Sequence, residues 1–191
     1  MAMRHQFGSI LWLRTVQVLI ALFMSSAAVA QSGLDLAGHA VNPLEGSAVT
    51  VLVFVRRDCP VSSRYAPVIE KISDEYSGRA KFWLVFPDQA DSAAEMRKYL
   101  SDYRYSLPAL SDPQRALVRA GRVQITPEVA VFREGRLIYD GRIDNWYVSL
   151  GKARAEPTTH ELRDALDAAL AGKIPAHAEV RGVGCYISDL E

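Results

Sequence analysis

The chain has 191 residues, and its 22 basic and 22 acidic side chains give a formal net charge of zero at pH 7. This balance argues against the basic surface of a nucleic-acid-binding protein, so no nucleic-acid partner is expected. Beyond an N-terminal segment, about 160 residues remain, enough for one domain that buries a full core without disulfides. The chain contains two cysteines, Cys59 and Cys185, which can pair in an oxidising compartment.

Residues 1–30 have the layout of a secretory signal peptide. Arg4 and Arg14 precede an apolar stretch, the segment contains no acidic residue, and the small residues Ala28 and Ala30 frame a cleavage site. The apolar stretch is shorter than the roughly 20 residues that a spanning helix needs. We therefore expect export to a periplasm or to the extracellular space. Contact with a membrane is expected only if the segment stays uncleaved.

The first predicted elements are a loop, a strand and a helix. Residues 31–47 contain several glycines and a proline and are expected to form an N-terminal loop. The run at 48–55 is apolar and β-branched, which is typical of a strand covered on both faces. A helix should begin at Pro60 and end at Gly78, with a kink at Pro67.

Strands and helices then alternate. We expect strands at 81–86 and 108–110 and helices at 91–103 and 111–118. This alternation predicts parallel strands joined by right-handed crossovers. Two further strands, at 128–132 and 137–140, follow as a hairpin.

The second half of the chain predicts antiparallel pairing. Residues 128–132 and 137–140 flank a turn that contains Gly135, which is typical of a β-hairpin. Residues 141–157 are expected to form a loop, because they mix charged, aromatic and glycine residues without a regular period.

The last predicted helix completes the domain. Thr158 and Glu161 fit a capping box ahead of an amphipathic pattern, and the predicted domain spans 48–172. The remaining C-terminal tail, 173–191, is expected to be extended or irregular, and it carries Cys185.

Cys59 is the strongest candidate for a reactive group. It lies at the predicted start of a helix, where unpaired N–H groups and the helix dipole lower the pKa of a thiol. Arg56, Arg57 and Arg64 are expected to add to this effect, whereas the negative charge of Asp58 opposes it. The alternative interpretation is an inert cysteine buried in the core.

Parts of the sequence resemble a known superfamily. The segment VLVFVRRDCPVSSRYAPVIEKISDEY, which contains Cys59, resembles the active-site segment of thioredoxins, and Thr126 and Pro127 before EVAVF resemble the element with the cis-proline of that fold. The stretches GRIDNWY and GCYI are similar to parts of exported bacterial redoxins of the peroxiredoxin and thioredoxin-like group. The resemblance covers most of 49–139. It implies a thioredoxin-like α/β fold, with a central mixed β-sheet flanked by helices.

The resemblance also implies thiol–disulfide oxidoreduction with Cys59 as the nucleophile. Thioredoxins have a second cysteine where this chain has Ser62, so Cys59 has no local partner for a disulfide. Cys185 is then the candidate resolving thiol, because the cost of closing a loop grows slowly with its length. A structural disulfide, or a separate thiol in the tail, are the alternatives for Cys185.

Four residues are candidate substrate contacts: Thr126, Pro127, Pro60 and Ser62. A cis bond before Pro127 would leave the backbone of Thr126 free to pair with an extended substrate, whereas an ordinary trans turn proline would not imply this. Arg142, Asp144 and Trp146 are candidates for the rim of the site. A solvated loop with a structural ion pair explains these three residues equally well.

Two other functions stay open. A thiol peroxidase is the first, although peroxiredoxins have a threonine where this chain has Arg56. A non-catalytic or copper-handling module is the second, with Cys59, Cys185 and a histidine such as His160 as soft ligands. No resident metal or cofactor is expected. The expected partners are protein or small-molecule thiols or disulfides, together with an electron donor that the sequence does not identify.

Overall fold

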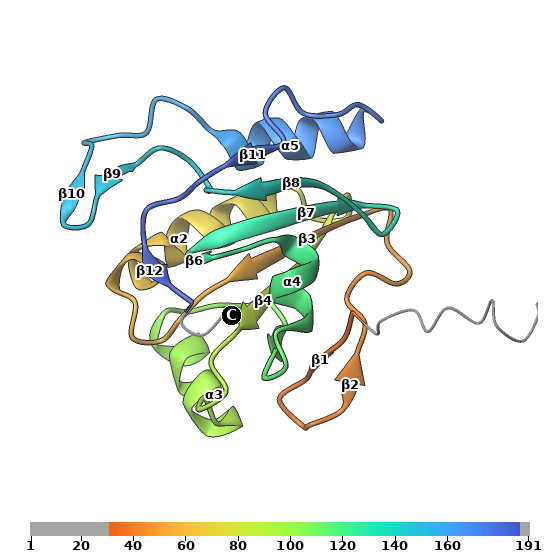
Figure 1. Cartoon of the computed structure of the whole chain (residues 1–191), viewed down its shortest axis with the longest axis vertical. Coiled ribbons are helices and arrows are strands. Elements are labelled where there is room, and N and C mark those ends of the chain that lie inside the picture. Colours follow the sequence, from red (N-terminus) through yellow and green to blue (C-terminus); the bar gives the residue numbers. More distant parts are fainter. Residues whose placement is uncertain (1–30, 188–191) are drawn as a thin grey trace, which may run out of the picture. The chain divides into compact units, whose positions relative to one another are not determined.

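The computed structural model describes residues 31–187, which belong to one compact unit of the chain. The predicted signal peptide lies outside the described residues. Figure 1 shows a central sheet with helices packed against it. None of the helices in the described part is long and apolar enough to cross a membrane.

The sheet of this unit is mixed, as predicted. Strands β3 (Val49–Phe54), β4 (Lys81–Phe86) and β5 (Ala109–Ser111) are parallel to one another. Strand β7 (Glu128–Arg133) pairs antiparallel with β3, and β8 (Arg136–Gly141) pairs antiparallel with β7, which confirms the predicted hairpin. The predicted α/β class, with a central mixed sheet flanked by helices, is confirmed.

Four helices flank this sheet within residues 31–187. They are α2 (Pro60–Glu75), α3 (Ala93–Asp102), α4 (Ala116–Gly121) and α5 (Glu161–Leu170). Strand β3 shows why both faces are covered, because its side chains alternate between two cores. Val51 and Val53 pack in the core that α2 and α5 share, whereas Leu52 and Phe54 pack in the core that includes α4.

The starts of three helices differ from the predictions. Helix α3 begins later because Ser92 caps it through a capping box with Glu95. Helix α4 also begins later than predicted, and the buried carboxylate of Asp112 accepts a hydrogen bond from its Val118 N–H at 2.8 Å. The capping box predicted for α5 is wrong. Its N-cap is His160, whose side chain makes no capping hydrogen bond.

Two predicted loops contain short hairpins. In the first, β1 (Gly33–Leu34) pairs with β2 (Ala40–Val41), and β1 joins the central sheet beside β5. In the second, β9 (Tyr147–Ser149) pairs with β10 (Lys152–Ala153). Strands of two or three residues are too short to show a periodic pattern, so the sequence did not predict them.

The C-terminal tail is extended, as expected, and it also pairs with the domain. Strand β11 (Glu179–Val180) adds parallel to β8, which gives the sheet order β11-β8-β7-β3-β4-β5-β1-β2. Strand β12 (Cys185–Tyr186) then pairs antiparallel with β6 (Ile125–Thr126), as Figure 1 shows for the blue segment. The tail thus carries Cys185 back to the predicted site.

Candidate active site

Cys59 lies where strand β3 gives way to helix α2. It is the N-cap residue of α2, Pro60 follows at the first helical position, and the Cys59 side chain does not take part in capping. Pro60 is exposed, whereas Cys59 is completely buried. The predicted placement of the thiol at a helix N-terminus is confirmed.

The surroundings of Cys59 favour its thiolate. Burial raises the pKa of the Cys59 thiol, but hydrogen bonds to the sulfur lower it by more, so the net shift is downward. The donors are the Cys185 thiol, the backbone N–H and hydroxyl of Ser62, and the backbone N–H of Val61. Two of these groups are N–H groups of the first turn of α2, which are the unpaired donors of a helix start.

Ser62 contributes a donor that the sequence argument missed. Its side chain is fully buried, and its hydroxyl accepts a hydrogen bond from the Arg56 N–H at 3.4 Å while it donates toward Cys59. The sequence predicts Ser62 as a substrate contact at the position of the second thioredoxin cysteine. In the structure Ser62 is buried and hydrogen-bonded to the Cys59 sulfur. A small hydroxyl residue in the first turn of a helix after a cysteine is the signal that could have indicated this role.

Thr126 connects the two cysteines. Its carbonyl oxygen accepts a hydrogen bond from the Cys59 thiol at 3.2 Å, and its hydroxyl donates to the Cys185 carbonyl at 3.3 Å. The bond between Thr126 and Pro127 is cis, as the resemblance to thioredoxins implied. Both residues are buried.

Cys185 is half-buried and lies opposite Thr126 in the β12–β6 pair. Both cysteines are free thiols, and they share a hydrogen bond. Burial raises the pKa of the Cys185 thiol, and donation to Cys59 and the charge of Asp58 raise it further, while Arg56 lowers it. Of the two thiols, Cys59 is therefore the one that ionises more readily.

The three arginines near Cys59 are held by other partners. Arg57 pairs with Asp91 at 2.5 Å, and Arg64 donates to the Tyr147 hydroxyl at 3.5 Å. Arg56 pairs with Asp58 and donates to the carbonyl of Tyr186 in β12 at 2.9 Å. The largest causes of the pKa shift of Cys59 are burial and hydrogen bonds from Cys185, Ser62 and Val61, and no arginine is among them.

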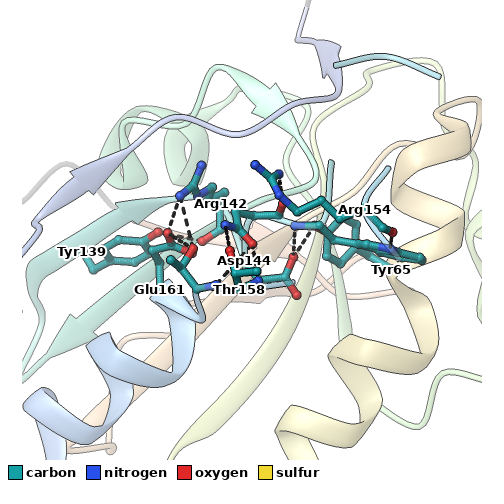
Figure 2. A network of polar contacts seen from close by, with 10 residues as sticks. Tyr65, Tyr139, Arg142, Asp144, Arg154, Thr158 and Glu161 are labelled. Carbon is teal, nitrogen blue, oxygen red and sulfur yellow. Dashed lines mark hydrogen bonds and ion pairs between the residues drawn. The ribbon is translucent and has the colours of Figure 1, made fainter. Parts of the chain in front are cut away.

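Two of the predicted rim residues, Arg142 and Asp144, belong to the network of polar contacts that Figure 2 shows. Arg142 forms an ion pair with Glu161 at the start of α5. Asp144 is buried and accepts a hydrogen bond from the Tyr65 hydroxyl of α2 at 2.6 Å. The Trp146 ring packs edge-on against Tyr65, with centroids 5.4 Å apart. These contacts join the loop after β8 to two helices, which favours the interpretation as a structural network.

Within residues 31–187, no group of three or more histidine, cysteine or acidic side chains is arranged to hold a metal ion. His160 is exposed at the start of α5 and lines a hollow beside Trp146 and Arg163. Neither Cys59 nor Cys185 lines this hollow, so the structure does not bring His160 together with the cysteines there.

Comparisons with known proteins agree with this architecture. Residues 46–137 match a family described as thioredoxin-like. A hypothetical protein from Sinorhizobium meliloti has a TM-score of 0.69 and 23% identity, with 82% of this chain and 88% of that chain covered. An uncharacterized conserved protein from Geobacillus kaustophilus has a TM-score of 0.67 and 22% identity, with 82% and 86% covered.

A further similar structure has a described activity. It is a secreted Mycobacterium tuberculosis disulfide oxidoreductase homologous to E. coli DsbE, with a TM-score of 0.51 and 15% identity, and 78% of this chain and 99% of that chain are covered. No curated protein matches the chain in sequence. At these identities the solved structures show a shared fold. Together with the family match over residues 46–137, they show that this chain has a thioredoxin-like fold.

Proposed function

We propose that the protein is a thiol–disulfide oxidoreductase with Cys59 as the nucleophile and Cys185 as the resolving thiol. One observation carries the proposal: β12 pairs with β6 so that the Cys185 thiol donates a hydrogen bond to the sulfur of Cys59. A low-pKa cysteine beside a second thiol is the arrangement that thiol–disulfide exchange requires.

In the first step, the Cys59 thiolate attacks one sulfur of a substrate disulfide. A bond forms between Cys59 and that sulfur, the substrate S–S bond breaks, and the other substrate sulfur leaves as a thiolate. The lowered pKa of Cys59 increases the fraction of attacking thiolate at a given pH. The Ser62 hydroxyl and the helix N–H groups hold this thiolate in the free protein.

In the second step, Cys185 attacks the sulfur of Cys59 and releases the second substrate thiol. The mixed disulfide carries no charge on Cys59, so the hydrogen bond to Cys59 and the charge of Cys59 no longer raise the pKa of Cys185, while burial and Asp58 still do. Arg56 then favours the Cys185 thiolate. The products are a Cys59–Cys185 disulfide and a substrate reduced by two electrons. An external dithiol restores the protein, and the reverse sequence oxidises a substrate dithiol.

The same proposal assigns partners and location. Substrates are thiols or disulfides of proteins or small molecules. Their proposed contacts are Thr126, whose carbonyl binds the Cys59 thiol, Pro127 and the exposed Pro60. Export follows from the layout of residues 1–30, and the similar Mycobacterium tuberculosis oxidoreductase is described as secreted. An oxidising location suits a protein that works through a disulfide.

Trapping of the mixed disulfide tests the proposal. We expect Cys185→Ser to accumulate a glutathione adduct on Cys59 when it is incubated with glutathione disulfide. The wild-type protein should instead form the internal disulfide and release glutathione. Mass spectrometry after rapid alkylation distinguishes the two products, and Cys59→Ser should exchange at least about a hundredfold more slowly.

The outcomes separate this function from the alternatives. Exchange that survives in Cys59→Ser would disprove the role of Cys59. Oxidation of Cys59 by hydrogen peroxide that is much faster than its reaction with disulfides would indicate a thiol peroxidase. Stoichiometric Cu(I) binding without exchange would indicate a copper-handling module.

A further inference from the structure

The thiol that should meet the substrate is covered by the protein's own tail. Cys59 has no exposed surface, while the segment 182–187 passes over it and presents Cys185 to its sulfur. For the proposed exchange, a substrate sulfur must reach Cys59. The covering segment, which we call the strap (182–187), therefore has to move.

The strap binds the domain mainly through its backbone. The Gly182 N–H donates to the Glu128 carboxylate at 2.7 Å, and the Ile187 N–H donates to the Gln124 carbonyl at 2.9 Å. Between them, the Cys185 carbonyl accepts from the Thr126 hydroxyl and the Tyr186 carbonyl accepts from Arg56. A backbone held along a strand edge in this way is the pattern of β-strand addition.

Glu128 binds both the loop before β7 and the strap. Its carboxylate is completely buried, and it accepts hydrogen bonds from the Gln124 and Ile125 N–H groups as well as from the strap. Arg181, just before the strap, lies 3.8 Å from it. Glu128, which follows Pro127, thus forms hydrogen bonds with the loop before β7 and with the first residue of the strap.

Gly184 allows the strap to approach closely. A Cβ at this position would overlap the carbonyl oxygen of Thr126. The side chains of the strap contribute less, because Tyr186 is 72% exposed and only Ile187 is buried, in the core that includes α4. The contact thus selects an extended backbone with a small residue before the cysteine.

We infer that the strap occupies, within the same chain, the β6 edge at which an extended polypeptide carrying the target cysteine docks, so that strap and substrate exclude each other. The inference rests on the proposed function and adds the class of substrate to it. The occupant seen in the structure is itself an extended polypeptide with a cysteine facing Thr126 and Cys59. A polypeptide substrate would repeat these backbone contacts once the strap has left, and the strap would displace the substrate from β6 when it returns to deliver Cys185 in the second step.

The experiment measures binding of a redox-inert peptide to the full chain. The probe is a fluorescein-labelled peptide with the sequence of residues 181–187 and the change Cys185→Ser, so no exchange takes place. We expect it to bind Gly184→Ala at least about tenfold more tightly than the wild type. The reason is that the apparent dissociation constant falls as the fraction of protein with an open edge rises. Fluorescence anisotropy gives the dissociation constants.

A second variant releases the strap through a different contact. Ile187→Ala removes the buried anchor at the end of the strap and should also tighten peptide binding. Ala176→Val is the matched control, because Ala176 is exposed in the tail outside the strap, and its affinity for the peptide should equal that of the wild type.

Equal affinity of the peptide for the wild type and both strap variants would overturn the inference. Tighter binding by both variants supports it. The peptide has no thiol, so this result does not depend on redox activity. Failure of the trapping experiment with glutathione disulfide would overturn the proposed function alone.

Discussion

At the scale of single residues, the reactivity of Cys59 depends on the few groups that form hydrogen bonds with its sulfur. The carbonyl of Thr126 accepts from the protonated thiol, whereas Cys185, Ser62 and the start of α2 donate to the thiolate. Burial alone would keep Cys59 protonated, and the donors outweigh it. The balance between acceptor and donors therefore sets the fraction of reactive thiolate.

Ser62→Ala tests this balance. The change removes a hydroxyl that donates to the thiolate, so the pKa of Cys59 should rise. We expect alkylation of Cys59 by iodoacetamide at pH 7 to slow by about three- to tenfold, and the rates to converge at high pH, where both proteins are fully ionised. The Cys185→Ser background leaves a single reactive cysteine for the measurement.

Ser73→Ala is the control for this prediction. Ser73 lies in the same helix, and its hydroxyl donates to the Glu70 carbonyl at 2.8 Å, away from Cys59. Its pH profile should match that of the parent protein. An unchanged profile for Ser62→Ala would contradict the prediction and would show that the helix N–H groups stabilise the thiolate without the Ser62 hydroxyl.

At the scale of elements, the pairing of β11 with β8 leaves a carboxyl in an unfavourable place. Asp140 of β8 is buried, and its Oδ2 atom has no hydrogen-bond partner among the described residues. Burial, together with the charge of Glu179 in β11, raises the pKa of Asp140 from 3.8 to about 6. Ionised Asp140 therefore opposes the docking of the tail at neutral pH.

Asp140→Asn should stabilise the folded protein in a pH-dependent way. Below pH 3.8 the carboxyl is protonated in both states, so the change has little effect there. The wild-type protein loses unfolding free energy as the pH rises through the window from 3.8 to 6, because Asp140 holds its proton more tightly in the folded state than in the unfolded state. We expect the variant to gain about 1–2 kcal/mol in unfolding free energy at pH 7.5.

Urea denaturation at pH 4 and at pH 7.5 measures this gain. Asp74→Asn is the control, since Asp74 is exposed, and it should change the unfolding free energy by less than about 0.5 kcal/mol at both values. A gain of equal size at both pH values for Asp140→Asn would contradict the titration argument.

At the scale of the whole molecule, the strap and the central sheet should differ in local stability. The sheet is held by long ladders such as β3 with β7, whereas β12 contributes two residues at an edge. Segments with few buried contacts open without global unfolding. The molecule is therefore expected to consist of a firmly folded domain and a strap that opens independently.

Native-state hydrogen exchange measures this difference. We expect the Gly182 and Ile187 amides to exchange through an opening at least about 2 kcal/mol below the free energy of global unfolding. The amides of Val51 and Val53 in β3 should exchange only through global unfolding. A strap whose amides exchange together with β3 would mean that the substrate edge is permanently closed.

The sequence by itself determined the parts of this protein that follow from local pattern. The apolar run of β3, the start of α2 at Pro60 and the hairpin of β7 and β8 all show in short stretches of sequence, because side-chain period and turn chemistry act over a few residues. The position of Cys59 at a helix N-terminus follows in the same way. The Thr126–Pro127 element came from resemblance to thioredoxins.

Only the tertiary structure decided how distant segments meet. Nothing within the tail indicates that Cys185 lies opposite Thr126, that Gly184 fits against its carbonyl, or that Glu128 receives Gly182. The failed capping box of α5 has the same origin, because Thr158 is bonded to Asn145 across the chain. Such contacts depend on which surfaces the packed core brings together, and a local pattern carries no information about that.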